Sequence, residues 1–264
     1  MTDKILELRA ITKTYPGVTA LSGVDLTVNR GEVLGLIGEN GAGKSTLMKI
    51  LGGVIAPSAG TITIDGVEHA SLTVNSSTGA GIAFVHQELN LFENLDVAGN
   101  VLIGREPRFG GFMKLIDQGA LRAKVQPLLD RLGVDFNARA LVEDLSIAQR
   151  QMVEIAKALS YDARVIIMDE PTSSLTLTET ERLLKVIGEL RASGVSVIYI
   201  SHRLSEVMAC ADRVVVLRDG QRVGALDRGE ITHDAMIRLM IGRSLKSLYV
   251  PPKNPPRDSG LVVE

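Results

Sequence analysis

The chain has 264 residues, which suits one large domain or two lobes that share a site. Hydrophobic residues make up 45% and charged residues 23%, as in an ordinary soluble globular protein, and the net charge of −2 gives no basic field that would indicate nucleic acid as a partner. The single cysteine, Cys210, excludes an internal disulfide framework and fits a reducing cytosol. No apolar run approaches the ~18 residues of a membrane span.

Two strands with one wet face are predicted at the start of the chain. Residues 5–8 and 20–28 alternate between apolar and polar side chains. Between them, Tyr15 precedes Pro16 and is therefore extended or in a turn. Its ring either presents a free face or is half buried in the strand, and the spacing does not separate these two interpretations.

A glycine-rich loop follows. Residues 38–45 read GENGAGKS and fit the pattern G-x-x-x-x-G-K-[ST] at every position. The apolar run 33–37 before the loop predicts a buried parallel strand. After the loop, the apolar spacing of residues 47–51 predicts a helix that ends at Gly52. A glycine-rich turn that binds nothing is the alternative, but the strand–loop–helix context favours phosphate binding.

The residue types of this loop suit a polyphosphate. Backbone N–H groups approach phosphate oxygens closely where no Cβ intrudes, and the N-terminus of the helix adds a positive dipole end. We expect Lys44 to reach the β- and γ-phosphates and the Ser45 hydroxyl to ligate Mg²⁺. The loop residues expected to contact a nucleotide are Gly38, Glu39, Asn40, Gly41, Ala42, Gly43, Lys44, Ser45 and Thr46.

Two more strands come next, at residues 60–64 and 82–85, and the first ends in an Asp-Gly turn. Gln87 sits just past the second strand. Since ligands gather at the carboxyl ends of strands in open α/β sheets, Gln87 is placed to meet nucleotide or metal. Taken alone it would be one more exposed glutamine.

Residues 88–160 change in character and predict a helical lobe inserted into the α/β core. A short capped helix is expected at 96–103, a loop at 105–114 and an amphipathic helix at 118–132. Ser146 is a plausible N-cap for a further helix with an apolar stripe. An ordinary capped helix would show the same spacing.

Two acids end the next predicted strand. Four apolar residues, 165–168, lead into Asp169, Glu170 and Pro171. Burying two like charges side by side is costly unless a cation or a hydrogen-bonded role compensates. Asp169 is placed to hold Mg²⁺ through its water shell, and Glu170 to orient the attacking water as a base. Two acids that simply leave the strand into solvent are the alternative.

A histidine follows the last buried strand, residues 195–200. A lone histidine is usually structural, but His202 lies just past the carboxyl end of a central strand and is a candidate to sense the γ-phosphate. Beyond it, a hairpin turning at Asp219-Gly220 and a helix capped by Thr232 are expected. Residues 251–256 predict a stiff proline linker.

These landmarks in this order, with LSIAQ at residues 145–149 as the signature, resemble the nucleotide-binding subunit of an ATP-binding cassette (ABC) transporter over about residues 4 to 245. The resemblance implies an α/β fold: a P-loop NTPase (RecA-like) core with an antiparallel β subdomain and an inserted α-helical subdomain. The core would comprise residues 1–87 and 161–245, and the helical signature subdomain residues 88–160. Residues 246–264 would form a linker and the start of a second cassette.

The same resemblance implies roles for single residues. Tyr15 would stack on adenine, Gln87 would contact Mg²⁺ and relay to the permease, and His202 would hold the γ-phosphate. Ser146 and Gln149 of the signature would contact nucleotide bound on a partner cassette. Catalysis would therefore fall to Glu170, His202 and Lys44, and metal binding to Ser45, Gln87 and Asp169, with ATP and Mg²⁺ as cofactors.

The phrases LSIAQRQMVEIAKAL, MDEPTSSLT and YISHRLSEV are similar to the monosaccharide-importer branch, in which one polypeptide carries two fused cassettes. We expect this chain to be the N-terminal cassette and to hydrolyse ATP to drive sugar import. The implied partners are a second cassette, integral membrane permease subunits (docked on residues 89–108) and, indirectly, an extracellular sugar-binding protein. The implied location is cytoplasmic, peripheral on the inner face of the plasma membrane, with no nucleic acid bound.

Two departures keep other functions open. Ile147 and Ala148 replace the two glycines of the usual signature L-S-G-G-Q, and Thr176 stands where the family often has aspartate. Ile147 should hinder approach to a nucleotide on the opposite cassette. The alternatives are a non-hydrolysing regulatory cassette, an importer of another substrate, and an ABC ATPase with a non-transport role in repair or translation. The acidic balance weighs against the last.

Overall fold

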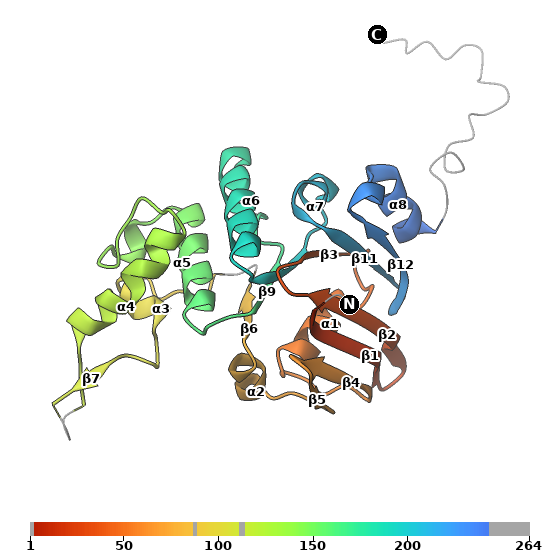
Figure 1. Cartoon of the computed structure of the whole chain (residues 1–264), viewed down its shortest axis with the longest axis horizontal. Coiled ribbons are helices and arrows are strands. Elements are labelled where there is room, and N and C mark those ends of the chain that lie inside the picture. The colour runs from red at the N-terminus through yellow and green to blue at the C-terminus, as the bar shows by residue number, and fades with distance from the viewer. Residues whose placement is uncertain (1–2, 87–88, 111–113, 243–264) are drawn as a thin grey trace, which may run out of the picture.

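A six-stranded sheet forms the centre of the molecule, whose computed structural model describes residues 3–86, 89–110 and 114–242 (Figure 1). Its strand order is β12-β11-β3-β10-β9-β6, and every neighbouring pair is parallel except β11 and β12. The strands are β3 (Val33–Ile37), β6 (Ile82–Val85), β9 (Val165–Asp169), β10 (Ser196–Ile200), β11 (Arg213–Arg218) and β12 (Gln221–Asp227). Gln87 and the predicted segment 246–264 lie outside the described residues.

Both faces of this sheet are buried, which explains why β9 is an unbroken apolar run. Ile166 and Met168 point into one hydrophobic cluster, and Val165 and Ile167 into another. The first cluster is covered by helices that include α6 (Leu177–Ala192), α7 (Leu204–Cys210) and α8 (His233–Ile241). The second contains α1 (Lys44–Leu51) and the antiparallel sheet.

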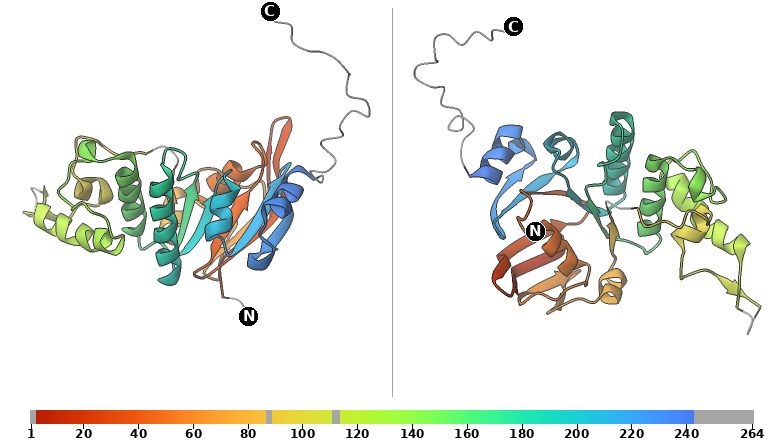
Figure 2. Two further views of the ribbon diagram at one scale, coloured as in Figure 1. Left: turned by 90° about the horizontal axis from the view of Figure 1, so that it is seen from above. Right: turned by 180° about the vertical axis from the view of Figure 1, so that it is seen from behind.

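The antiparallel sheet has the order β2-β1-β4-β5 and forms a subdomain at the side of α1 (Figures 1 and 2). Its strands are β1 (Lys4–Tyr15), β2 (Val18–Asn29), β4 (Ala59–Ile64) and β5 (Val67–His69), and α2 (Val74–Gly79) follows. The two predicted strands with one wet face are confirmed and run longer than expected. Tyr15 ends β1 and pairs with Val18 across the turn at Pro16 and Gly17.

The helical lobe lies at the opposite end of the molecule from the antiparallel sheet (Figure 1). Its elements are α3 (Val97–Val101), α4 (Gln118–Arg131), η2 (Val142–Asp144) and α5 (Ile147–Leu159). The expectation of a loop at 105–114 is wrong in part, because β7 (Arg108–Phe109) pairs antiparallel with β8 (Leu115–Ile116). Two-residue strands are too short to show an alternating pattern, and half of this ribbon lies beyond the predicted loop.

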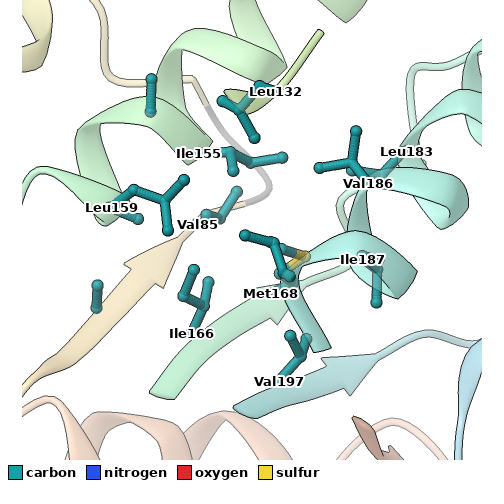
Figure 3. Close-up of a cluster of buried hydrophobic side chains, with 14 of the residues drawn as sticks. Val85, Leu132, Ile155, Leu159, Ile166, Met168, Leu183, Val186, Ile187 and Val197 are labelled. Atoms are coloured by element: carbon teal, nitrogen blue, oxygen red, sulfur yellow. The ribbon is translucent and has the colours of Figure 1, made fainter. Parts of the chain in front are cut away.

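The hydrophobic core continues from the sheet into the helical lobe. In Figure 3, Leu132 and Ile155 from the lobe face Met168 of β9 and Val186 of α6. The cluster therefore crosses the predicted boundary of residues 88–160, and a movement of the lobe against the sheet would have to shift these packed side chains. The division of the chain into domains stays a prediction.

The helices α6 and α7 are not among the predicted elements, although the sequence carries a local signal for α6. Thr176 and Glu179 form a capping box at its start, with the Thr176 amide donating to Glu179 Oε2 at 2.9 Å. The predicted caps Asp96, Ser146 and Thr232 each accept a backbone N–H as expected. Within the described ranges, no helix combines the length and the apolar composition needed to cross a bilayer.

The buried face of β9 gives a first prediction. Replacing Ile166, which is 0% exposed, by alanine removes packed atoms that link β9 to the helices and should cost about 2–5 kcal/mol in the free energy of unfolding. The matched control is Ile116→Ala at a side chain that is 43% exposed, where the loss should be about 1 kcal/mol or less. Urea unfolding of both variants checks this, and equal losses would contradict the packing described here.

Candidate functional site

The loop between β3 and α1 is wedged against backbone from two other strands. A Cβ on Gly38 would lie 2.3 Å from the Leu217 carbonyl oxygen, and a Cβ on Gly43 would lie 2.9 Å from that of Ala20. Gly41 has a positive φ of 83°, and nothing lies within 4 Å of the place where its Cβ would be. Packing therefore requires glycine at positions 38 and 43, whereas the space beside Gly41 is open.

Lys44, the first residue of α1, closes this loop into a ring. Its Nζ donates to the carbonyl oxygens of Gly38 at 2.6 Å and Glu39 at 3.0 Å. Partial burial lowers the pKa of the Lys44 ammonium, and the nearby carboxylates of Glu170 and Asp169 oppose this. The ammonium thus lies between the loop and two acids from another strand.

These two acids end β9, as predicted. Burial is the main cause that raises the pKa of Asp169, and the adjacent Glu170 carboxylate raises it further. His86 and Lys44 oppose this rise. Glu170 has a positive φ of 47°, which is uncommon for a residue with a side chain, and its amide donates to the Ile200 carbonyl at 2.9 Å. The backbone therefore turns sharply after Asp169, and the ends of β9 and β10 are joined.

The histidine after β10 meets the second acid. His202 Nδ1 lies 3.2 Å from Glu170 Oε1, and the two side chains are 63% and 26% exposed. Strands β9 and β10 are parallel neighbours, so their carboxyl ends bring residues together that are far apart in the sequence.

A cavity of about 340 Å³ gathers much of the predicted site. The predicted residues that line it fall on the glycine-rich loop, the start of α1 and the end of β9: Asn40, Gly41, Ala42, Gly43, Lys44, Ser45, Thr46, Asp169 and Glu170. Ala20 also lines the cavity from β2, and no local pattern in the sequence indicates this role. His86 was missed too: it stacks on Phe84, with ring centroids 5.7 Å apart, and lies near enough to Asp169 to affect its pKa.

Six other predicted residues do not line this cavity: Tyr15, Gly38, Glu39, Ser146, Gln149 and His202. Tyr15 is 42% exposed, and the Lys13 ammonium lies 5.2 Å from the centroid of its ring. Ser146 and Gln149 line a separate cavity of about 600 Å³, whose walls come from the segment 132–136 after α4, from the start of α5 and from α6. Gln87 lies outside the described residues.

Within its own lobe, the signature is held by local hydrogen bonds. Ser146 and Gln149 form a capping box at the start of α5, and Gln149 Nε2 also donates to Asp135 Oδ1 at 2.9 Å. Ile147, between them, is 52% exposed. The start of α5 thus presents a β-branched side chain to the surroundings.

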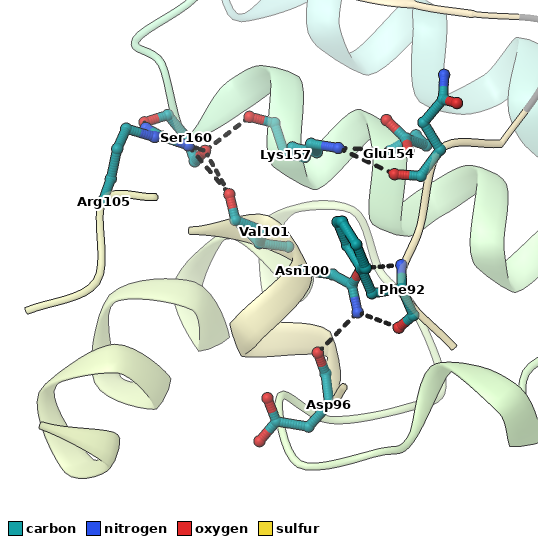
Figure 4. A network of polar contacts seen from close by, with 9 residues as sticks. Phe92, Asp96, Asn100, Val101, Arg105, Glu154, Lys157 and Ser160 are labelled. Atoms are coloured by element: carbon teal, nitrogen blue, oxygen red, sulfur yellow. Dashed lines mark hydrogen bonds and ion pairs between the residues drawn. The ribbon is translucent and has the colours of Figure 1, made fainter. Parts of the chain in front are cut away.

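One buried side-chain amide, that of Asn100, holds the backbone from Phe92 to Asp96 (Figure 4). Asn100 is 1% exposed, and its side chain accepts from the Phe92 amide at 2.7 Å and donates to the carbonyls of Phe92 at 3.0 Å and Asp96 at 3.1 Å. Phe92 itself is 53% exposed. The predicted docking surface 89–108 therefore contains an exposed ring whose backbone is firmly held.

The fold and the site define an α/β protein with a glycine-rich loop after β3 and a pair of acids at the end of β9. Residues 21–173 match the family model described as "ABC transporter", and the chain belongs to this family. An ATP-binding cassette of an ABC transporter in its ADP conformation superposes with a TM-score of 0.81 at 26% identity, covering 92% of this chain and all of that one. The predicted fold class, a P-loop NTPase core with two subdomains, is confirmed.

Among curated proteins, the chain is similar to a putative ribose/galactose/methyl galactoside import ATP-binding protein of Agrobacterium fabrum, with 52% identity over 96% of this chain and 50% of that protein. It is also 47% identical to a ribose import ATP-binding protein of Streptomyces avermitilis, over 99% of this chain and 49% of that protein. The chain thus spans about half the length of the curated relatives it matches.

The raised pKa of Asp169 yields a second prediction. A carboxyl whose pKa is raised by folding costs stability once it ionises, so the penalty appears as pH rises through the folded-state pKa. In nucleotide-free and magnesium-free protein, Asp169→Asn should raise the melting temperature near about pH 8, and the gain should shrink as pH falls toward the usual aspartate range of about 4. Melting curves across this range measure it.

The control for this prediction is Asp219→Asn. Asp219 is 93% exposed, so the same chemical change should leave the melting temperature nearly unaltered at every pH. A pH-independent effect of Asp169→Asn, or a lower melting temperature near pH 8, would contradict the assignment of a burial penalty.

Proposed function

We propose that this chain is an ATP-binding and ATP-hydrolysing cassette that energises the import of a monosaccharide, of the ribose and galactose type, through a membrane permease. The observation that carries the proposal is one cavity in which the glycine-rich loop and Lys44 face Asp169 and Glu170. Family membership and the names of the half-matching relatives support the transport role.

The loop binds the phosphates of the nucleotide. Within the part of the chain that the structure describes, Leu47 is the first residue of α1 whose amide donates to a backbone carbonyl, that of Gly43 at 2.9 Å. The earlier N–H groups of the helix are therefore open to phosphate oxygens. Lys44 exchanges its two carbonyl acceptors for the β- and γ-phosphates. Tyr15 is exposed enough to stack on adenine, which completes the nucleotide contacts of this chain.

Magnesium fits the oxygen donors of this cavity. The Ser45 hydroxyl and the Asp169 carboxylate both line it, and these are ligands that Mg²⁺ prefers. Gln87 is the third proposed ligand. When bound, the ion offsets the charge of the phosphates and removes the penalty of the buried Asp169 carboxylate.

Hydrolysis falls to Glu170 and His202. Glu170 accepts a hydrogen bond from the attacking water and orients it in line with the γ-phosphate, and His202 holds that phosphate and stabilises its charge. The 3.2 Å separation of His202 Nδ1 and Glu170 Oε1 supports a joint role for these two groups.

The catalytic site needs a second cassette. Ser146 and Gln149 line a different cavity from the loop of their own chain, so they contact nucleotide only on a partner. The relatives' double length supports fusion to that partner, with Ile147 slowing the composite site that this signature completes. The permease docks on residues 89–108, the sugar-binding protein acts from outside the cell, and the cassette lies in the cytoplasm on the inner face of the membrane.

Lys44 provides the test of nucleotide binding. Lys44→Ala should raise the Kd for ATP with magnesium roughly 10- to 100-fold, because it deletes charge-assisted contacts to the phosphates. Lys49→Ala, at an exposed lysine of the same helix, should leave Kd unchanged. Isothermal titration calorimetry compares the two, and tight binding by the Lys44 variant would exclude the proposed phosphate site.

Glu170 provides the test of hydrolysis and transport. In the full-length polypeptide with its permease, Glu170→Gln should lower kcat for ATP roughly 10²- to 10⁴-fold while ATP binding persists, because only the base for water is lost. Uptake of labelled ribose or galactose by cells carrying the variant should fall in parallel. Glu181→Gln, at an exposed acid on α6, is the control for both measurements. Hydrolysis at the normal rate would remove Glu170 from this role, and sugar uptake that persists without hydrolysis would remove the transport function.

A further inference from the structure

A third acid lies behind the catalytic face and has no part in the mechanism above. Glu206, on α7, is 6% exposed, and its Oε2 accepts three hydroxyl hydrogen bonds: from Thr172 at 2.7 Å, Tyr199 at 2.8 Å and Ser201 at 3.1 Å. Its other oxygen, Oε1, lies 3.3 Å from Arg203 Nη1. One buried oxygen therefore collects three donors.

Two of these donors belong to the segments that carry the catalytic pair. Thr172 follows Glu170 by two residues, and Ser201 immediately precedes His202. Ser201 Oγ also accepts from the Arg203 amide at 3.0 Å, which fixes the chain on the far side of His202. The carboxylate of Glu206 thus joins the segment after β9 to the segment after β10.

The Glu206 contacts reinforce the backbone hydrogen bond at this junction, from the Glu170 amide to the Ile200 carbonyl. A strained residue such as Glu170 keeps its conformation only where the surroundings hold it on both sides. Thr172 is 1% exposed and Ser201 3%, so neither hydroxyl can turn to solvent for a replacement partner.

A carboxylate is a costly way to fill a buried space. An apolar side chain on α7 would pack there without desolvating a charge, and Glu206 is kept only because donors surround it. Burial, and then the charge of Glu206, raises the pKa of Tyr199, so this phenol stays protonated and remains a donor. The arrangement is a hydrogen-bonded junction and not an accident of packing.

We propose that Glu206 is a positioning residue for ATP hydrolysis, holding Glu170 and His202 at their mutual distance by anchoring Thr172 and Ser201. The proposal rests on the proposed ATPase function. It assigns to Glu206 no contact with nucleotide, metal or water, and its effect passes through the two segments it joins.

The sharpest test compares two buried threonines in the full-length polypeptide with its permease. Thr172→Val removes one hydroxyl from Glu206 and should lower kcat about tenfold, while KM for ATP changes less than about threefold because the phosphates are held by the β3–α1 loop. Thr180→Val makes the same change on α6, at a hydroxyl that is buried and without a hydrogen-bond partner in the described structure, and should leave kcat unaltered.

A second variant tests the acid itself. Glu206→Gln keeps the size of the side chain but loses the charge, and should lower kcat about tenfold or more with a similar KM. The double variant Thr172→Val with Glu206→Gln should be within about twofold of Glu206→Gln alone, because both changes break the same link. Melting temperatures separate a loss of folded protein from a loss of positioning.

Each result decides the matter. A normal kcat in Thr172→Val or Glu206→Gln, or additive losses in the double variant, overturns the positioning role while leaving the ATPase function in place. A loss of kcat in Thr172→Val that matches the loss in Thr180→Val does the same, because it would reflect packing alone. If the wild-type polypeptide itself hydrolyses no ATP, the proposed function falls and the positioning role falls with it.

Discussion

The close contact between the glycine-rich loop and the backbone of two other strands is the constraint on which the site depends. Carbonyl oxygens of Leu217 and Ala20 occupy the space that side chains on Gly38 and Gly43 would need. The turn at Gly220 holds this contact together, since its amide donates to the Ala42 carbonyl at 3.2 Å and its carbonyl accepts from the Ser22 amide at 2.8 Å. The antiparallel sheet, β11 and the loop therefore keep a fixed relation before any ligand arrives.

Charge is organised around this rigid frame. Burial lowers the pKa of Lys44 and raises the pKa of Asp169, so the charged form of each side chain is disfavoured in the cavity. A ligand of opposite charge can relieve this cost. Stability is thereby sacrificed where binding is needed. Cys210 shows the contrast: its burial raises the thiol pKa to about 12, which makes it a packed side chain and not a reactive group.

The parts of this structure that the sequence predicts are those whose signal is local. The loop, β3, β9 and β10 follow from apolar runs and glycine spacing, and the caps of α3, α5 and α8 from single residues. What the sequence does not reveal depends on distant partners: β7 becomes a strand only through β8, and His86 and Glu206 acquire importance only from neighbours brought by other strands. The helix α6 is a different case, since its Thr176–Glu179 capping box is a local signal that is visible in the sequence.

Two separate cavities of this chain are lined by predicted site residues. Lys44, Asp169 and Glu170 line one cavity, whereas the start of α5 belongs to another wall, where local bonds already satisfy Ser146 and Gln149. A side chain whose hydrogen bonds are already made within its own chain gains little binding free energy from a new partner, unless that partner is charged. A phosphate at a helix N-terminus is such a charged partner. Ile147, which is 52% exposed, places a β-branched side chain at this same helix N-terminus, between Ser146 and Gln149.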